Sequence, residues 1–103
     1  MSKQMSYTRL WNNATVSIGD FSDHLIMTGF NKLQIYGASA TGAGTAQVQT
    51  SHDAVTWYDS GQVLIMNAAS DFFGEFNNTG IYVRIKVDAA FTGLTMRVNS
   101  EEQ

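Results

Sequence analysis

Residues 81–87 read IYVRIKV, and this stretch decides the fold class. In an extended chain its aliphatic side chains fall on one face: Ile81, Val83, Ile85 and Val87. Its polar and aromatic side chains fall on the other face: Tyr82, Arg84 and Lys86. An α-helix would scatter the aliphatic residues around its axis, whereas a strand sends successive side chains to opposite faces. The stretch therefore predicts a half-buried β-strand.

A second alternating stretch, residues 94–98, follows after a short connection. Its aliphatic side chains would point inward together: Leu94, Met96 and Val98. Thr95 and Arg97 would point outward. The connection, residues 88–93, ends in glycine and has the length of a hairpin loop. We therefore predict an antiparallel C-terminal hairpin over residues 81–98.

The same period-two pattern recurs upstream, in residues 14–18, 32–36, 46–50 and 55–58. It places Ile18, Val55 and Trp57 inward, and Gln47 and Gln49 outward. Two further segments are apolar throughout, which is typical of strands buried on both faces: residues 25–27 and 63–66.

An additional N-terminal strand is compatible with residues 7–11, and residues 67–73 are the best candidate for a single helical turn. Together the segments give about eight strands at roughly ten-residue spacing. The sequence thus predicts an all-β protein, an antiparallel β-sandwich of jelly-roll or discoidin-like type.

Length and composition fit one globular domain. At 103 residues the chain is near the commonest domain size, so residues 1–103 are predicted to form a single domain. We expect loosely ordered ends at residues 1–6 and 99–103. The sequence has no cysteine, which excludes disulfides and thiolate metal sites. It starts without the apolar core of a signal peptide and has no apolar run near the ~20 residues that span a bilayer, so no membrane partner is expected.

Few residues are charged, and the balance is acidic. Charged residues make up 15% of the chain, against about 25% in typical domains, and the net charge is −3. An acidic chain is poorly suited to phosphate backbones, so nucleic acid is not an expected partner. A weakly charged surface is compatible with an ordinary monomer or with association, and we expect a homo-oligomer.

Ser51, His52 and Asp53 are the residue types of a catalytic triad, but they are consecutive. Adjacent residues of an extended chain point to opposite faces, so these three cannot form a nucleophile–base relay. A turn whose amides are satisfied by Asp53 is the favoured interpretation. The sequence predicts no enzyme, no catalytic residue and no cofactor.

Metal ligands are equally sparse. His24 and His52 lack the spacing of paired zinc ligands. Asp20 and Asp23 lie in a polar loop that could offer oxygen ligands to calcium, although a turn or cap is the favoured interpretation. We therefore predict no metal site.

The outward residues of the predicted hairpin form the candidate contact surface. Tyr82, Arg84 and Lys86 would lie beside Arg97 on the neighbouring strand, which gives a basic patch with an aromatic edge. Such a patch suits an acidic partner surface; an ordinary solvated sheet face is the alternative.

Aromatic side chains give two more candidates. Tyr58 would contact a partner or a glycan, because the C–H faces of sugars pack against aromatic rings. The alternation points the adjacent Trp57 the opposite way, and whether Trp57 is core or exposed stays open. Phe72, Phe73 and Phe76 form an aromatic loop that either plugs one end of the sandwich or acts as a contact patch.

Two stretches together resemble a known family. Residues 48–58, VQTSHDAVTWY, resemble the strand–turn–strand element V-x-x-S-x-D-G-x-x-W of discoidin-like and carbohydrate-module sandwiches. Residues 79–87 are similar to the strand G-x-Y-V-R-I-x-V that follows it there. The same pairing occurs in small structural proteins of tailed-phage particles, including head-decoration and fibre-type domains. The resemblance covers residues 32–98 and departs at Ala54, where the element has a turn glycine, which leaves the turn type open.

The resemblance implies a non-enzymatic structural component of a phage particle, either a capsid decoration or a fibre-type domain. Such a protein would be made in the host cytoplasm, reside in the virion, and contact copies of itself, a capsid or another virion protein. A carbohydrate-binding β-sandwich module is the alternative. Fold analogy alone assigns no ligand site.

Overall fold

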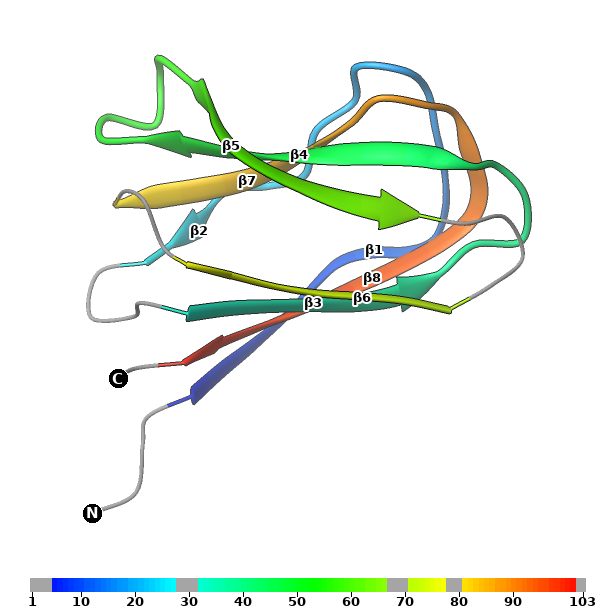
Figure 1. Ribbon diagram of the computed structural model, residues 1–103, viewed down its shortest axis with the longest axis horizontal. Coiled ribbons are helices and arrows are strands. Elements are labelled where there is room, and N and C mark those ends of the chain that lie inside the picture. The colour runs from blue at the N-terminus through cyan, green and yellow to red at the C-terminus, as the bar shows by residue number, and fades with distance from the viewer. Residues whose placement is uncertain (1–4, 28–31, 67–70, 78–80, 102–103) are drawn as a thin grey trace.

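The computed structural model has eight β-strands in two layers (Figure 1), and it describes residues 5–27, 32–66, 71–77 and 81–101. The strands are β1 (Met5–Val16), β2 (Leu25–Ile26), β3 (Lys32–Ala38), β4 (Gly44–Ser51), β5 (Tyr58–Met66), β6 (Asp71–Asn77), β7 (Tyr82–Val87) and β8 (Phe91–Glu101). One antiparallel sheet has the order β1-β8-β3-β6, and the other has the order β2-β7-β4-β5. The all-β sandwich predicted from the alternation is confirmed. The described residues include no helix that is long and apolar enough to cross a membrane.

The inward side chains of both sheets pack into one apolar core. β7 and β8 supply seven apolar side chains that are at most 1% exposed: Val83, Ile85, Val87, Phe91, Leu94, Met96 and Val98. β3 and β4 add four more: Leu33, Ile35, Ala46 and Val48. Burial of one large aliphatic side chain stabilises a fold by about 1.5–3 kcal/mol, so these central strands hold the two layers together.

The predicted C-terminal hairpin over residues 81–98 is wrong. β7 pairs with β2 and β4, whereas β8 pairs with β1 and β3, so the two strands belong to opposite sheets. Figure 1 shows the chain crossing from one layer to the other after β7. Strands of both layers bury alternate side chains in the same core and therefore show the same pattern. The alternation identified the buried face but could not identify the partner strand.

Three apolar side chains that the alternation placed inward point to solvent. Ile18, Val55 and Ile81 are 74%, 79% and 46% exposed, and each lies just outside a strand. A period of two fixes the face of a side chain only while the backbone is paired in a sheet. Where the strand ends, the chain leaves the sheet and the alternation no longer applies.

The two wholly apolar segments have one buried and one exposed face. Their exposed residues are Ile26, Val63 and Ile65. They lie on β2 and β5, which are the two edges of one sheet. Among the described strands none packs over these three side chains, so the prediction of burial on both sides is wrong.

Residues 71–77 form an edge strand, β6, where the sequence predicted a helical turn and an aromatic loop. Phe72 is buried and Phe76 packs against the core, while Phe73 points outward and is exposed. The aromatic residues thus alternate as a strand requires, and the predicted loop is wrong. Residues 67–70 of the predicted helical turn lie outside the described residues.

β1 and β8 pair over most of their length and are longer than the sequence indicated. β1 joins the predicted segments 7–11 and 14–18 into a single strand that ends at Val16. β8 continues to Glu101, and Asn99 and Ser100 within it are buried, although we expected a loosely ordered end there. Each of these strands is extended by pairing with the other, and the local sequence does not reveal this pairing.

The two sheets are joined along one flank by a side chain that reaches across from β5 to β6. Gln62 donates a hydrogen bond from Nε2 to the carbonyl of Asn77 (2.8 Å) and accepts one at Oε1 from the amide of Asn77 (2.9 Å). Gly74 on β6 allows the close approach, because a Cβ there would lie 2.8 Å from Cδ1 of Leu64. The two edge strands thus meet through Gln62 and Leu64, whereas Val63 and Ile65 of β5 stay exposed on its outer face.

Paired cysteines test the strand order. Gln47 and Lys86 are direct cross-strand partners on β4 and β7, so the double variant Gln47→Cys/Lys86→Cys should form an intramolecular disulfide. Lys86→Cys/Arg97→Cys should not, because these residues face away from each other on layers about 10 Å apart. The natural sequence has no cysteine, so thiol titration and mass spectrometry read the bond directly. A disulfide in the second variant and none in the first would contradict the topology.

Candidate functional site

The structure divides the five predicted contact residues between two surfaces. Tyr82, Arg84 and Lys86 lie on β7, and Tyr58 begins β5 of the same sheet, but Arg97 lies on β8 of the opposite sheet. The predicted continuous basic patch is therefore wrong, because it depended on the hairpin. Whether these residues contact a partner remains a proposal.

Arg84 is the centre of an aromatic cluster on the outer face of β7. Its guanidinium carbon lies 3.9 Å from the ring centroid of Phe21 and 4.5 Å from that of Trp57. We call Arg84, Phe21 and Trp57 the Arg84 clamp. His24 continues the cluster, with its ring 6.2 Å from Trp57 and 5.3 Å, edge to face, from Tyr82. Cation–π contacts of this kind hold a guanidinium plane in place.

A hydrogen-bond chain beneath the clamp fixes one side of the guanidinium. Nε of Arg84 donates to Oε1 of Gln49 (2.7 Å), and Nε2 of Gln49 donates to Oδ1 of Asp59 (2.9 Å). Gln49 faces outward as predicted but is 7% exposed, because these partners cover it. Its placement explains how a polar residue is buried on the outer side of the sheet.

The terminal nitrogens of Arg84 make no hydrogen bond to the described residues. Within the part of the chain that the structure describes, Nε alone makes a hydrogen bond, and no carboxylate pairs with the guanidinium. The side chain is half-buried, and burial lowers the pKa of Arg84. A guanidinium that is partly desolvated and lacks a counter-ion keeps its remaining donors available for a ligand.

The loop before β2 places Phe21 by pairing with β7. Phe21 forms an isolated bridge with Lys86, and Ser22 donates its amide to the carbonyl of Ile85 (2.8 Å). Ser22 Oγ in turn accepts a hydrogen bond from the amide of Ile85 (3.0 Å). Asp20 accepts the amide of Ser17 at Oδ2 (2.8 Å), which is the turn role favoured over calcium binding. Among the described residues no three His, Cys, Asp or Glu side chains gather as a metal site.

The turn after β4 places Trp57, and it confirms the turn interpretation of residues 51–53. Ser51 Oγ accepts the amides of Asp53 and Ala54, at 3.2 and 2.9 Å. Asp53 Oδ1 accepts the amides of Val55 and Thr56, both at 2.9 Å. Residues 55–57 belong to this turn rather than to a strand, and Trp57 ends half-buried on the outer face instead of in the core.

Asp53 gives this turn a dependence on pH. Hydrogen bonds from the amides of Thr56 and Val55 and from the Ser51 hydroxyl lower the pKa of Asp53 from its ordinary value of 3.8 to about 2. A lowered pKa in the folded state adds stability above the unfolded value, and that stability is lost as the pH falls through the folded value. Asp53→Asn should thus lower the melting temperature at neutral pH, and the difference should shrink between about pH 4 and about pH 2. Thermal unfolding followed by circular dichroism measures it, and a difference independent of pH would contradict the role of the carboxylate.

Ala54 occupies a left-handed conformation in the same turn, with φ of 62°. A residue with a Cβ is disfavoured there by about 1–2 kcal/mol, whereas the extra freedom of glycine in the unfolded chain costs about 0.4–1 kcal/mol. Ala54→Gly should therefore stabilise the protein by about 0.5–1 kcal/mol in denaturant unfolding. Ala90→Gly is the control, because Ala90 is exposed and has no positive φ, and it should destabilise slightly. Equal changes in the free energy of unfolding for both substitutions would contradict the backbone strain assigned to Ala54.

The clamp borders a hollow of about 170 Å³ on the outer face of this sheet. Its lining residues come from the two turns and from β7: Phe21, Ser22, Asp23, His24, Ala54, Trp57 and Arg84. The sequence singled out Arg84 and the adjacent Tyr82, and the structure brings these two into one cluster. It missed Phe21 and His24 because their loop pairs with β7 from 63 or more residues away, which no local pattern reveals. Tyr58 stands in register with Thr50, on the other side of its strand from Asp59, and does not line the hollow.

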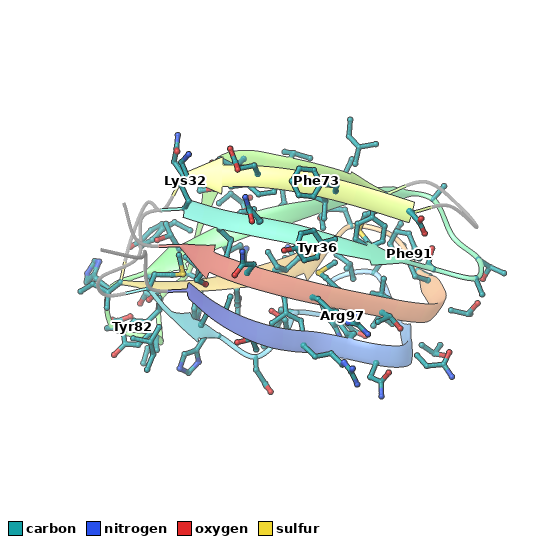
Figure 2. All side chains as sticks on the ribbon, turned by 90° about the horizontal axis from the view of Figure 1, so that it is seen from below. Lys32, Tyr36, Phe73, Tyr82, Phe91 and Arg97 are labelled. Atoms are coloured by element: carbon teal, nitrogen blue, oxygen red, sulfur yellow. The ribbon has the colours of Figure 1, made fainter. Side chains whose placement is uncertain are left out.

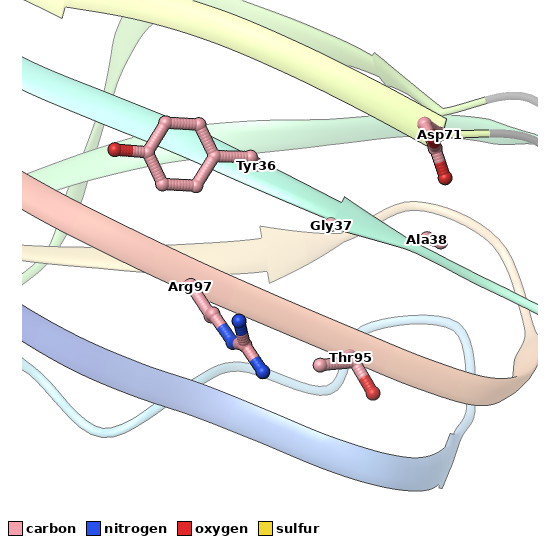
Figure 3. A pocket seen from close by; sticks show the side chains of 6 residues that line it. All are labelled: Tyr36, Gly37, Ala38, Asp71, Thr95 and Arg97. Atoms are coloured by element: carbon pink, nitrogen blue, oxygen red, sulfur yellow. The ribbon is translucent and has the colours of Figure 1, made fainter.

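A second hollow, of about 250 Å³, lies on the outer face of the opposite sheet (Figure 3). Arg97, Tyr36 and Phe73 form one row across β8, β3 and β6, with the two rings stacked at 5.6 Å (Figure 2). In the next row the small side chain of Ala38 stands between Thr95 and Asp71, which leaves the depression. Arg97 therefore belongs to a different surface from the Arg84 clamp.

Comparison with known proteins identifies the fold. No protein-family model and no curated protein matches the sequence. The structure of the SPBc2 prophage-derived protein YomS is similar over 99% of this chain and 96% of that one, with a TM-score of 0.72 and 9% identity. A subunit of Bacillus endospore appendages, described as disulfide-linked pili, matches with a TM-score of 0.52 and 13% identity over 100% and 93% of the two chains. The Tobacco streak virus coat protein, solved as a dimer, matches with a TM-score of 0.52 and 10% identity over 96% and 86%. At these identities the likeness shows a shared fold, which confirms the resemblance to small phage β-sandwich proteins at that level.

Proposed function

We propose that this chain is a non-enzymatic structural component of a phage particle, a capsid decoration or fibre-type domain that acts through protein–protein assembly. The observation that carries the proposal is the exposed apolar outer face of the edge strand β5. This strand ends its sheet, and its outward residues Val63 and Ile65 are 42% and 67% exposed. Exposed large apolar side chains on a sheet edge mark a surface that another chain can cover.

The edge of β5 lacks the features that usually keep sheet edges apart. Natural edge strands carry charges, especially lysine, or bulges that prevent pairing with another chain. In β5 the register shift at Gly61, with φ of 86°, affects the first half of the strand. The second half, residues 62–66, reads QVLIM and has no charged residue. We therefore assign residues 62–66 as the assembly edge, and a second copy of this chain as its occupant.

The fold comparisons supply supporting context. Three proteins with this fold are a prophage-derived protein, a subunit of spore pili and a virus coat protein solved as a dimer. The pili are disulfide-linked, and this chain has no cysteine. Assembly of this chain would therefore rest on apolar burial and edge pairing rather than on covalent links.

A charge placed on the assembly edge tests the proposal. The wild-type chain should form an oligomer in size-exclusion chromatography with light scattering, and Ile65→Lys should convert it to a monomer, because a lysine buried in the interface loses its hydration. Ile18→Lys is the matched control, since Ile18 is similarly exposed but lies in a turn rather than on an edge. A strictly monomeric wild-type chain at millimolar concentration, or equal effects of both substitutions, would contradict the proposal.

The genes beside its coding sequence provide a test of the virion assignment. Neighbours that encode capsid or tail proteins would support a virion component. A location within a metabolic operon would contradict it.

A further inference from the structure

We propose that the hollow beside the Arg84 clamp binds a neutral saccharide through a pair of adjacent hydroxyl groups. The proposal is independent of the assembly edge, since Val63 and Ile65 do not line this hollow. It rests on three features of the site: fixed donors, an acceptor in the same hollow, and an exposed aromatic wall.

The donors are the terminal nitrogens of Arg84. They carry four N–H groups, and Nε is already bonded to Gln49, which in turn is bonded to Asp59. Phe21 and Trp57 cover the guanidinium at 3.9 and 4.5 Å from the ring centroids. The guanidinium is thus oriented before a ligand arrives, so binding costs little side-chain entropy.

Asp23 is exposed and lines the same hollow, and we assign its carboxylate as the acceptor. The hydroxyl of Ser22 is not available, because it accepts from the amide of Ile85 and donates to the carbonyl of Asp23. A hydroxyl group can both accept and donate a hydrogen bond. In a pair of adjacent hydroxyls, one can therefore accept from Arg84 while its neighbour donates to Asp23. An anion would meet Asp23 and a cation would meet Arg84, so the mixed pair favours a neutral polyol.

The apolar wall is the ring of Phe21, which is 57% exposed beside the hollow. Sugars present C–H groups on the faces of the ring, and these faces pack against exposed aromatic side chains. His24, also exposed at the rim, can donate or accept a further hydrogen bond. The site therefore combines the apolar wall and the few placed polar groups of a small-ligand site.

Nuclear magnetic resonance provides the primary test. The ¹⁵N-labelled chain would be titrated with the methyl glycosides of glucose, galactose, mannose and N-acetylglucosamine at millimolar concentrations. At least one of them should shift the indole N–H of Trp57 and the amides of residues 22–24. Trp11 is an internal reference, because it packs against the core from β1 of the opposite sheet and should not move.

Two variants with matched controls identify the contacts. Asp23→Asn and Arg84→Lys should each weaken the binding at least about tenfold. Asp23→Asn removes the charge of the acceptor, and Arg84→Lys keeps the charge but removes the planar guanidinium that Gln49, Phe21 and Trp57 hold in place. Glu75→Gln and Arg9→Lys make the same chemical changes on the opposite sheet and should leave the affinity unchanged. Circular dichroism melts confirm that all four variants are folded.

Several results would overturn the proposal. If none of the four glycosides shifts the indole N–H resonance of Trp57, the proposal is wrong. Shifts produced by acetate or phosphate but by no glycoside would make the hollow an anion site instead. Equal binding by wild type and Asp23→Asn would exclude the paired contact. Each of these readouts is separate from the oligomeric state, so a failure here does not bear on assembly.

Discussion

The burial of alternate side chains between the two sheets is the constraint on which the other features depend. In β7, Val83 and Ile85 are buried in the core, so Arg84 between them must project from the outer face. The charge of Arg84 is then accommodated by groups that come to it: two aromatic rings above and Gln49 beside it. The core and the outer cluster are consequences of the same strand geometry.

The sequence was sufficient for the fold class and for most of the core. Alternation in residues 81–87 and 94–98 identified Val83, Ile85, Leu94 and Met96 as buried side chains. It failed on strand pairing, because β7 and β8 present identical patterns to one core from opposite layers. The alternation also gave the wrong face just beyond strand ends, as at Ile81, because backbone that is not paired in a sheet does not keep alternate side chains buried.

The candidate site was only partly accessible from the sequence. Arg84 and Tyr82 could be assigned to an outer face from their position in the alternation, and Asp53 could be assigned to a turn from its residue type. Phe21 and His24 could not be connected with Arg84, because the path of their loop depends on a hydrogen bond between Ser22 and the distant Ile85. Trp57 follows a turn with local hydrogen bonds, but the position of that turn beside Arg84 depends on the pairing of β4 with β7. Arg97 was misplaced for a related reason, since its neighbours are set by the sheet order.

The position of β8 has a consequence for the order of folding. This strand, residues 91–101, lies between β1 and β3, so the first and last strands of the described fold pair directly with each other. During synthesis β1 and β3 leave the ribosome long before the strand that separates them, and their sheet cannot form until residues 91–101 have emerged. Pairing of such distant segments requires closure of nearly the whole chain into one loop, which is entropically costly and slows folding. The domain is thus expected to fold only once residues 91–101 have emerged, in the millisecond-to-second range typical of β-sandwiches, rather than strand by strand as it is made.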